Sequence, residues 1–429
     1  MITFDEITTQ IKSLFANYHT LIPSLGTIVI NRDLYGRVRL ILKEDIEHDV
    51  QLMTQVSQLL HALIEHLSPH IWPIEQVLLF EEDIDSVYSS APHFTLEGFE
   101  NIFIVDRLAT ETNWSAITPP SQEAVPRVVF FSIKGGVGRS SALAATAWSL
   151  AQSGKRVLIL DLDLESPGLS TALLPDDKQP RYGITDWLVE DLVDNAESIF
   201  SDMVATSDLS HDGQIYVVPA HGTDAGEYVS KLGRVWMPKV TQNGTRELWS
   251  NRLQRLVNNL ESEYQPDIIL IDSRAGIDEV ASSCVTDLGA SLILLFSIEG
   301  SQTWSGYKIL FEHWQRSGVI EDIRERLQIV SAITPDVGTL AYLEQLRDNA
   351  YNLFSETQYD EIPAGAVVNE HWNFESADET APHYPLVVNW HRSFAGLSSL
   401  HRRLNEVDDS NIQLIFGKLI DSIKQYAQD

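Results

Sequence analysis

The sequence predicts an α/β fold with a mostly parallel sheet covered by helices on both faces, preceded by a small α+β domain. The first observation is a series of apolar runs from Arg127 onward, separated by helical segments: VVFFSI, RVLILDLD, IYVVPA, DIILIDS, ASLILLFSI and LQIVSAI. Near-continuous apolar strands that alternate with helices are typical of parallel sheets buried on both faces. The second observation is that residues 1–118 lack this pattern. The chain therefore divides into two parts.

The N-terminal part, residues 1–118, is predicted to contain a hairpin, a helix and two further strands. The segment GTIVINRDLYGRVRLILKED alternates apolar and polar residues around a turn at 33–36, which indicates a β-hairpin. DVQLMTQVSQLLHALIEHL has apolar residues at helical spacing, and EQVLLFEE and ENIFIVDRL are typical of short strands. No chemical motif occurs here. The proline-rich stretch that follows predicts a linker over 119–126.

Residues 127–429 are predicted to form the second domain. After the strand-like runs, the segment NIQLIFGKLIDSIKQYAQD places apolar residues on one face of a final amphipathic helix. Parallel sheets bind ligands at the carboxyl ends of their strands. The chemical motifs of this chain all follow strand-like runs, so we expect them to gather at that edge.

The charge of the chain restricts its partners. The formal net charge is −31, from 30 Lys and Arg against 61 Asp and Glu. A surface this acidic repels DNA phosphates and anionic lipids at long range. We therefore expect a protein or small-molecule partner, with neither nucleic acid nor membrane binding.

Cysteine content and hydropathy restrict the compartment and the kind of site. Cys284 is the only cysteine, so neither an internal disulfide nor a cysteine-rich metal or iron–sulfur site is expected. The N-terminus lacks the pattern of a secretion signal, and no apolar run approaches the roughly 20 residues that cross a bilayer. The sequence therefore predicts a cytoplasmic protein.

A glycine-rich loop between the first strand-like run and the next helix predicts a phosphate site. Its glycines let backbone N–H groups converge on phosphate oxygens, and the helix N-terminus adds positive potential. The Ser140 hydroxyl stands where it would bind the Mg²⁺ that bridges the terminal phosphates. The predicted nucleotide-binding residues of the loop are Lys134, Gly135, Gly136, Val137, Gly138, Arg139, Ser140 and Ser141.

Acidic residues end two of the strand-like runs. One run ends with Asp161 and Asp163, and another ends with Asp272, which Gly276 follows. The first pair suits a loop that positions an attacking water, and Asp272 suits a direct or water-mediated Mg²⁺ contact. We predict that Ser140, Asp163 and Asp272 form the metal site.

Four segments resemble the deviant Walker A P-loop ATPases of the ParA/MinD family, of the SIMIBI class: KGGVGRSS, LILDLDLESPGL, IYVVPAHG and IILIDSRAGID. The resemblance covers about 127–335 and has no counterpart in 1–118. It implies a P-loop NTPase fold, ATP and Mg²⁺ as ligands, and an ATP-dependent homodimer. It further implies that Lys134 reaches the partner subunit's phosphates, that Asp163 supports hydrolysis, and that Asp272 and Gly276 belong to switch II.

Arg139 departs from the family pattern because it replaces the lysine of the loop. Arginine keeps the charge, but its planar fork contacts phosphate differently from a compact ammonium group. With Lys134, Asp163 and Arg139 as the predicted catalytic residues, we expect a slowly hydrolysing ATPase that acts as a dimerisation switch and controls a partner protein. The alternative is a catalytically inert ATP-sensing scaffold in a signalling or defence assembly.

Two further departures concern Arg274 and the base. Arg274 replaces a proline of the resembling switch II segment. It could contact the γ-phosphate or a partner, or it could be an exposed arginine with neither role. The run LQIVSAITPD lacks the asparagine that often contacts adenine in the family, so Asn389 or the backbone at Thr334 and Pro335 is the predicted substitute.

Three functions found in the family are not expected for this chain. The net charge argues against DNA partition, the single cysteine argues against iron–sulfur transfer, and the last helix carries only Lys418 and Lys424 as basic residues for a membrane. We expect the N-terminal domain to bind a partner protein or the neighbouring subunit.

Overall fold

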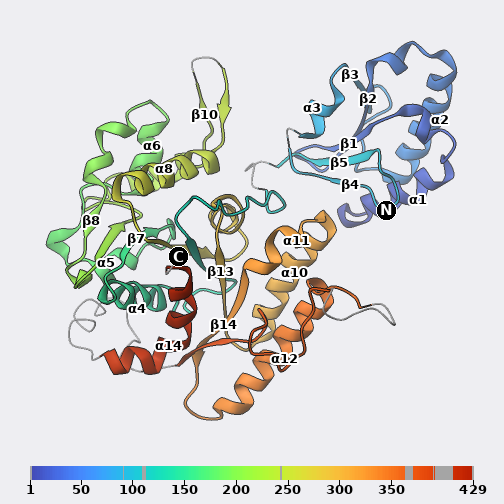
Figure 1. The fold of residues 1–429 in the computed structure, drawn as a ribbon. Helices are drawn as coiled ribbons and strands as arrows, with labels where there is room; N and C mark the ends of the chain where they lie inside the picture. The colour runs from blue at the N-terminus through green and yellow to red at the C-terminus, as the bar shows by residue number, and fades with distance from the viewer. Residues whose placement is uncertain are drawn as a thin grey trace. The chain divides into compact units, whose positions relative to one another are not determined.

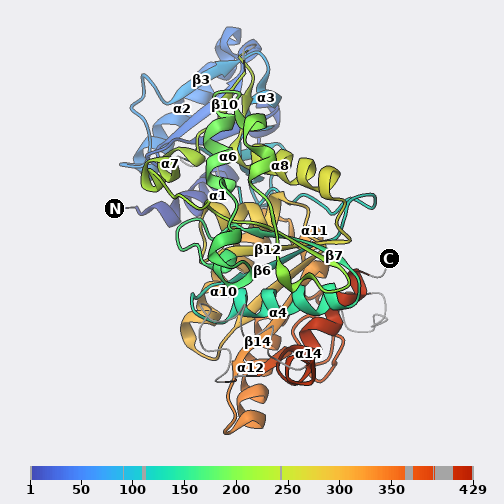
Figure 2. The same ribbon diagram turned by 90° about the vertical axis from the view of Figure 1, so that its left-hand side faces the viewer.

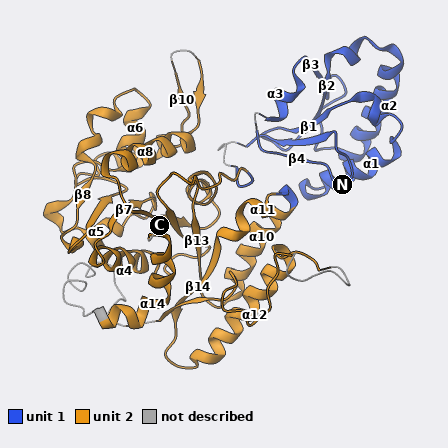
Figure 3. Ribbon diagram, in the orientation of Figure 1, with its two compact units in different colours: residues 1–115, 316–318 blue, residues 116–315, 319–429 orange. Residues whose placement is uncertain are grey.

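The computed structural model describes residues 2–89, 91–108, 113–241, 244–362, 371–389, 391 and 409–427. The chain forms two compact units, shown in separate colours in Figure 3. The N-terminal unit comprises residues 1–115 with 316–318, and the C-terminal unit comprises residues 116–315 with 319–429. Among the described residues, none of the helices is both long and apolar enough to cross a bilayer.

The N-terminal unit contains the hairpin, the helix and the two strands that the sequence predicts, together with additional short elements (Figure 1). Asp49 caps the predicted helix, because its side chain accepts hydrogen bonds from the amides of Gln51 and Leu52. In chain order the elements are α1 (Ile7–Asn17), β1 (Ile28–Arg32), β2 (Val38–Lys43), α2 (Val50–Leu67), β3 (Leu78–Glu81), α3 (Ile84–Ser89), β4 (His93–Thr95) and β5 (Ile102–Asp106).

The sheet of this unit has the order β3-β2-β1-β5-β4 and is mixed. β1 pairs antiparallel with β2 and parallel with β5. Alternation along β1 divides the core, because Ile28 and Ile30 pack in the cluster with α1 and α2, whereas Val29 packs with Ile84 of α3. Helices therefore contact both faces of a separate mixed sheet.

The C-terminal unit begins with the elements that carry the glycine-rich loop at 134–141, called the phosphate loop below, and the two acidic strand ends. The first half contains β6 (Arg127–Ser132), α4 (Arg139–Gln152), β7 (Arg156–Asp161), α5 (Leu169–Leu173), α6 (Ile184–Asp191), β8 (Ala205–Thr206), β9 (Gln214–Val218), α7 (Tyr228–Val235), β10 (Lys239–Val240), β11 (Arg246–Glu247) and α8 (Trp249–Tyr264). The second half contains β12 (Ile268–Ala275), α9 (Glu279–Ser282), β13 (Leu292–Ser297), α10 (Ser301–Ser317), α11 (Ile320–Ile323), β14 (Leu327–Thr334), α12 (Thr339–Thr357), β15 (Leu386–Asn389) and α14 (Asp409–Tyr426).

Within the described residues, the large sheet has eight strands in the order β15-β14-β13-β6-β12-β7-β9-β8. All neighbouring strands are parallel except β8, which pairs antiparallel with β9. Every residue of β6 and β13 is buried, as expected for central strands of a covered parallel sheet. The predicted α/β class with a mostly parallel sheet is confirmed.

Helices cover both faces of this sheet. Val128 and Phe130 of β6 share one hydrophobic cluster with α4 and α14, and Figure 2 shows α14 beside α4. The next residue, Phe131, points to the other face and contacts Tyr307 of α10 with ring centroids 6.1 Å apart. The order β6-β12-β7 places three strand ends next to one another, and the sequence motifs follow those strands.

Candidate functional site

The phosphate loop connects β6 to α4 and requires glycine at two positions. Gly136 and Gly138 have φ angles of 73° and 81°, a left-handed conformation that side chains with a Cβ rarely adopt. Gly138 is the N-cap of α4 and, having no side chain, leaves the first amides of this helix without the usual side-chain cap. Uncapped amides at the start of a 14-residue helix form a site of positive potential open to an anion.

Arg139, the first residue of α4, places a guanidinium group inside this site. Its side chain is 7% exposed. Nη2 lies 3.5 Å from Oδ2 of Asp163, whereas Nη1 has no hydrogen-bond partner among the described residues. A buried donor without a partner is costly. The arrangement therefore favours an anionic ligand that would accept from Nη1.

Ser140 and Asp272 are brought together as the predicted metal site requires. The Ser140 hydroxyl donates to Oδ2 of Asp272 at 2.5 Å. Asp272 is buried, and its Oδ1 has no partner among the described residues. Burial raises the pKa of Asp272 to about 6, although Arg139 and the Ser140 hydroxyl partly offset this effect. A buried carboxylate oxygen without a partner suits a cation.

Asp161 lies next to Asp272, because the two residues are paired in register between β7 and β12. Its Oδ2 accepts from the Leu169 amide at 3.2 Å, and its Oδ1 has no partner among the described residues. Complete burial, with the charges of Asp272 and Asp163, raises the pKa of Asp161 to about 8. The sequence pairs Asp161 with Asp163 at the strand end, but Asp161 is not among the predicted metal or nucleotide ligands. Its position two residues before Asp163 at the strand end was the available signal.

The available ligands fit Mg²⁺ only in company with phosphate and water. Among the described residues, no group of three or more His, Cys, Asp or Glu side chains is arranged to hold a metal ion. Mg²⁺ commonly takes one or two protein ligands and fills its shell with phosphates and water. Ser140 and Asp272 meet that requirement. Asp163, the third predicted ligand, contacts Arg139 and the Ser166 amide, at 3.5 and 3.3 Å.

The segment after Asp272, which the family resemblance predicts to be switch II, is tied to both neighbouring loops. The Gly276 amide donates to the Ser132 carbonyl at 2.9 Å, and its φ angle of 100° requires glycine. Arg274 contacts two carboxylates, Glu165 at 2.5 Å and Asp278 at 3.2 Å. Arg274 therefore joins switch II to the loop after β7, a contact that sequence reasoning did not anticipate.

Lys134 is exposed at the start of the loop. Its carbonyl accepts from the Ser132 hydroxyl at 2.8 Å, and in the described part of the chain no carboxylate pairs with its ammonium group. Its neighbour Ser141 is half-buried. Lys134 therefore lies at the surface of the chain.

The residues proposed for base contact lie together at the ends of β14 and β15. Thr334 and Asn389 are paired in register. The Asn389 amide donates to the Leu414 carbonyl at 2.8 Å, and the Pro335 carbonyl accepts from the Thr339 hydroxyl at 2.7 Å. These two groups are therefore already engaged within the chain.

Ile333, one residue before Thr334, was not predicted as a site residue. Its φ angle is 51°, a value that is an outlier for a β-branched side chain. Its Cγ1 lies 3.8 Å from the point where Gly138 would carry a Cβ. The strained residue thus lies beside the phosphate loop, and no sequence pattern predicts a backbone angle.

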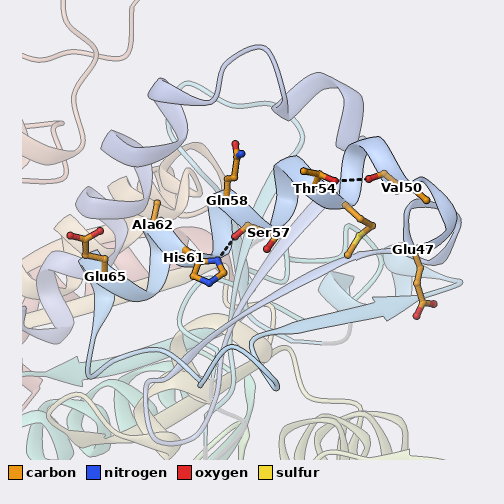
Figure 4. Close-up of a pocket in the computed structure, with 9 residues that line it drawn as sticks. Glu47, Val50, Thr54, Ser57, Gln58, His61, Ala62 and Glu65 are labelled. Atoms are coloured by element: carbon orange, nitrogen blue, oxygen red, sulfur yellow. Dashed lines mark hydrogen bonds between the residues drawn. The ribbon is translucent and has the colours of Figure 1, made fainter.

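A shallow groove of about 880 Å³ lies on the exposed face of α2 in the N-terminal unit (Figure 4). The His61 ring donates through Nδ1 to the Ser57 carbonyl at 2.7 Å, and the Thr54 hydroxyl donates to the Val50 carbonyl at 2.9 Å. These polar groups are satisfied by their own helix, so the groove offers no counterpart to the unpartnered groups around the phosphate loop.

Comparison with known proteins matches residues 125–191 to a ParA family model described as NUBPL iron-transfer P-loop NTPase. The chain is 39% identical over 70 residues to the cytosolic Fe-S cluster assembly factor CFD1 of Yarrowia lipolytica, covering 16% of this chain and 24% of that protein. It is 24% identical over 168 residues to the septum site-determining protein MinD of Bacillus subtilis, covering 39% and 52%. The chain thus spans about a quarter and about half of the length of these two relatives.

Two solved structures are similar to this chain. The ParA family ATPase from Chlorobium tepidum matches with a TM-score of 0.45 and 16% identity, covering 69% of this chain and 99% of that one. The septum site-determining protein MinD of Pyrococcus horikoshii, complexed with Mg-ADP, matches with a TM-score of 0.44 and 18% identity, covering 71% and 98%.

Proposed function

We propose that the C-terminal unit, which contains a P-loop NTPase domain of the ParA/MinD family, binds ATP with Mg²⁺ and hydrolyses it slowly as a dimerisation switch. One observation carries the proposal. Buried Arg139 and buried Asp272 each keep one polar atom without a partner among the described residues, at the uncapped start of α4. An unpartnered donor beside an unpartnered carboxylate oxygen suits an anion bound together with a cation.

The phosphate loop would hold the phosphates. The first amides of α4 and Nη1 of Arg139 supply donors, and the left-handed glycines keep side chains out of the space. Ser140 and Oδ1 of Asp272 would hold Mg²⁺, which supplies charge neutralisation and bridges phosphate oxygens when bound.

Asp163 is proposed to orient the attacking water. Its carboxylate is 17% exposed and lies 3.5 Å from Arg139. Phosphate oxygens would compete with Asp163 for this guanidinium group, because both are anions. Nucleotide binding would therefore weaken the ion pair and leave Asp163 able to accept a hydrogen bond from water. In this way Arg139 would keep Asp163 engaged until a nucleotide is bound.

Lys134 is proposed to act across a homodimer, since it is exposed and pairs with no carboxylate in the described part of the chain. The N-terminal unit is proposed to carry the output by binding a partner protein or the neighbouring subunit, because its separate sheet has its own core. The mass in solution with ATP, measured on an Asp163→Ala variant to block hydrolysis, should be twice that with ADP. Equal masses would refute the dimer switch.

Iron–sulfur transfer is not proposed, although the matched model and one relative carry that description. Cys284 is the only cysteine of the sequence. It is buried, and burial raises the pKa of its thiol. A single buried thiol that resists deprotonation is a poor ligand for a cluster.

The deciding experiment measures ATP binding and ATP turnover with Mg²⁺ for the wild type and for Asp163→Ala. We expect both proteins to bind ATP and only the wild type to turn it over. Absence of ATP binding in the wild type would refute the proposed function. Equal turnover in the two proteins would mean that the chemistry lies elsewhere.

A second candidate function is the inert ATP-sensing scaffold, and the Arg139–Asp163 ion pair favours it. If the pair persists when nucleotide binds, Asp163 stays engaged and no water is oriented. This candidate predicts stoichiometric ATP binding without turnover, and no gain of turnover in Arg139→Lys. Turnover that appears in Arg139→Lys would instead assign the inactivity to the arginine alone.

A further inference from the structure

Three consecutive residues of the loop after β7 are each held by a different element. Arg139 of α4 contacts the Asp163 carboxylate at 3.5 Å. The Tyr228 hydroxyl of α7 donates to the Leu164 carbonyl at 2.6 Å. Arg274 of switch II contacts the Glu165 carboxylate at 2.5 Å. Three elements that are distant from one another in the sequence therefore contact adjacent residues of the loop that carries Asp163, the residue proposed to support hydrolysis.

The contact from Tyr228 differs from the other two. Arg139 and Arg274 hold the loop through ion pairs, and bound phosphate would compete with the loop carboxylates for such cations. The Tyr228 hydroxyl donates to a backbone carbonyl, which carries no charge that an anion could displace. This hydrogen bond is therefore the contact of the three that can persist when a nucleotide occupies the phosphate loop.

Tyr228 is itself firmly oriented. Its ring packs edge-on against His221 with centroids 5.2 Å apart, and the Thr185 hydroxyl of α6 donates to its oxygen at 3.4 Å. Lys231, one turn further along α7, pairs with Asp186 of α6 at 2.6 Å. Burial raises the pKa of Tyr228, so the hydroxyl keeps its proton and remains a donor at neutral pH. A shift of α7 against α6 would move the donor.

We propose that Tyr228 is a positioning residue through which α7 sets the placement of Asp163. The Leu164 carbonyl belongs to the peptide directly after the Leu164 Cα, one residue from Asp163, so fixing its direction restricts the backbone that carries the catalytic carboxylate. The proposal rests on the proposed function for its kinetic consequence. It also makes α7, where neighbouring Val229 is 85% exposed, a place from which contacts would alter hydrolysis.

The first test is hydrogen–deuterium exchange of the full chain without added nucleotide. In Tyr228→Phe, which keeps the ring and removes only the hydroxyl, amides of the 162–169 segment should exchange about five-fold faster, the factor that a typical hydrogen bond represents. Tyr359→Phe is the matched control, because it removes a hydroxyl that contacts His383 in the same unit. Exchange at 162–169 should not change there. Unchanged exchange in Tyr228→Phe would overturn the proposal.

The second test measures ATP turnover. In Tyr228→Phe we expect kcat to fall about five-fold with KM unchanged, whereas a general loss of stability would lower activity equally in the Tyr359→Phe control. A kcat equal to wild type would overturn the kinetic role of Tyr228. Failure of the proposed function is recognised separately, since a wild type that binds no ATP leaves the exchange experiment fully interpretable.

Discussion

Two buried charge clusters in the C-terminal unit differ in how well their carboxylates are satisfied. In the first, Asp191 at the end of α6 accepts from Arg252 at 2.7 Å, from Arg255 at 2.9 Å and from Lys239 at 3.1 Å. Arg252 is fully buried and also donates to the carbonyls of Leu188 and Met237. Every charged group at the centre of this cluster has several partners.

The second cluster lies beside the phosphate loop and is short of cations. Asp161 and Asp272 are paired across neighbouring strands, and each keeps one oxygen without a partner among the described residues. The charge of Arg139 acts on Asp272, but this guanidinium group already contacts Asp163. The charge that this cluster lacks is the charge that a metal ion would supply.

The pKa values of the two clusters move in opposite directions. Burial raises the pKa of Asp191, but the hydrogen bonds from Arg255, Arg252 and Lys239 outweigh burial and leave it lowered. Burial raises the pKa values of Asp161 and Asp272 without sufficient compensation. A buried charge whose partners satisfy it belongs to the scaffold, whereas a buried charge without enough partners indicates a ligand site.

The largest expected effect is on stability, in the cluster formed by Asp191, Arg252, Arg255 and Lys239, which we call the scaffold cluster. Asp191→Ala leaves buried Arg252 without its carboxylate, and breaking a buried pair in this way typically costs about 3–5 kcal/mol of unfolding free energy. Denaturant unfolding measures the loss. Glu247→Gln is the control, since Glu247 pairs with the same Arg255 at a partly exposed position and should cost at most about 1 kcal/mol. A loss in Asp191→Ala as small as the control would remove the distinction.

Asp272→Asn should have the opposite profile. The amide keeps an oxygen to accept from Ser140 and removes a buried negative charge, so stability without nucleotide should not fall. Binding of ATP with Mg²⁺ should weaken at least about 100-fold, because even residues behind metal ligands commonly contribute 10- to 100-fold. Calorimetric titration with and without Mg²⁺ measures this. Equal loss of stability and binding would make Asp272 a structural residue.

The fold was predictable from sequence because buried parallel strands leave long apolar runs. The segments 127–132, 156–161, 268–275 and 292–297 are strands as predicted, and the loop from Lys134 to Ser141 connects a strand to a helix as its glycines indicate. Spacing of apolar residues also placed the final helix, whose buried face includes Ile412, Leu419 and Ile423. These features depend on local pattern.

The contacts around the loop after β7 were not predictable, because they depend on how distant elements meet. Arg274 joins Glu165 across 109 positions of the chain, and Tyr228 joins Leu164 across 64. Neither pair has a characteristic spacing. Asp161 could be suspected from its motif, but its raised pKa follows from complete burial next to Asp272, which only the strand order β12-β7 establishes.

Another expected effect concerns pH. The folded-state pKa of Asp161, about 8, lies above its ordinary value of 3.8, so the folded state holds an extra proton between these values. Stability from this group is therefore full below about pH 4 and is lost as the pH rises towards 8. Asp161→Asn removes this dependence, so its stability relative to wild type should increase with pH, by up to about 1.4 kcal/mol per unit.

Urea unfolding of both proteins between pH 5 and 8 provides the measurement, with Asp191→Asn as the contrasting substitution in the scaffold cluster. The Asp191 pKa is lowered, so this second variant should show no relative gain as the pH rises through the same window. Parallel stability profiles for wild type and Asp161→Asn would mean that Asp161 is ionised in the folded protein, and the contrast between the clusters would then lose its electrostatic basis.

The smallest expected effect concerns backbone strain beside the phosphate loop. Ile333 has a φ angle of 51° and lies beside Gly138 of the phosphate loop. Glycine adopts this conformation freely, so Ile333→Gly should be more stable than Ile333→Ala by about 1 kcal/mol. At Ala350, inside α12, the same change from alanine to glycine should destabilise by about 1 kcal/mol. Thermal unfolding compares these three variants with wild type.

Nucleotide affinity should follow the reverse order at this position. If the strained backbone serves the phosphate loop, Ile333→Ala loses the side-chain contact near Gly138, and Ile333→Gly also loses the backbone restraint. Affinity for ATP should then decrease from wild type through the alanine variant to the glycine variant, while stability rises between the last two. If ATP affinity instead rises with stability from the alanine to the glycine variant, the strain at Ile333 has no role in nucleotide binding. The unsatisfied buried charges would then be the remaining evidence for the site.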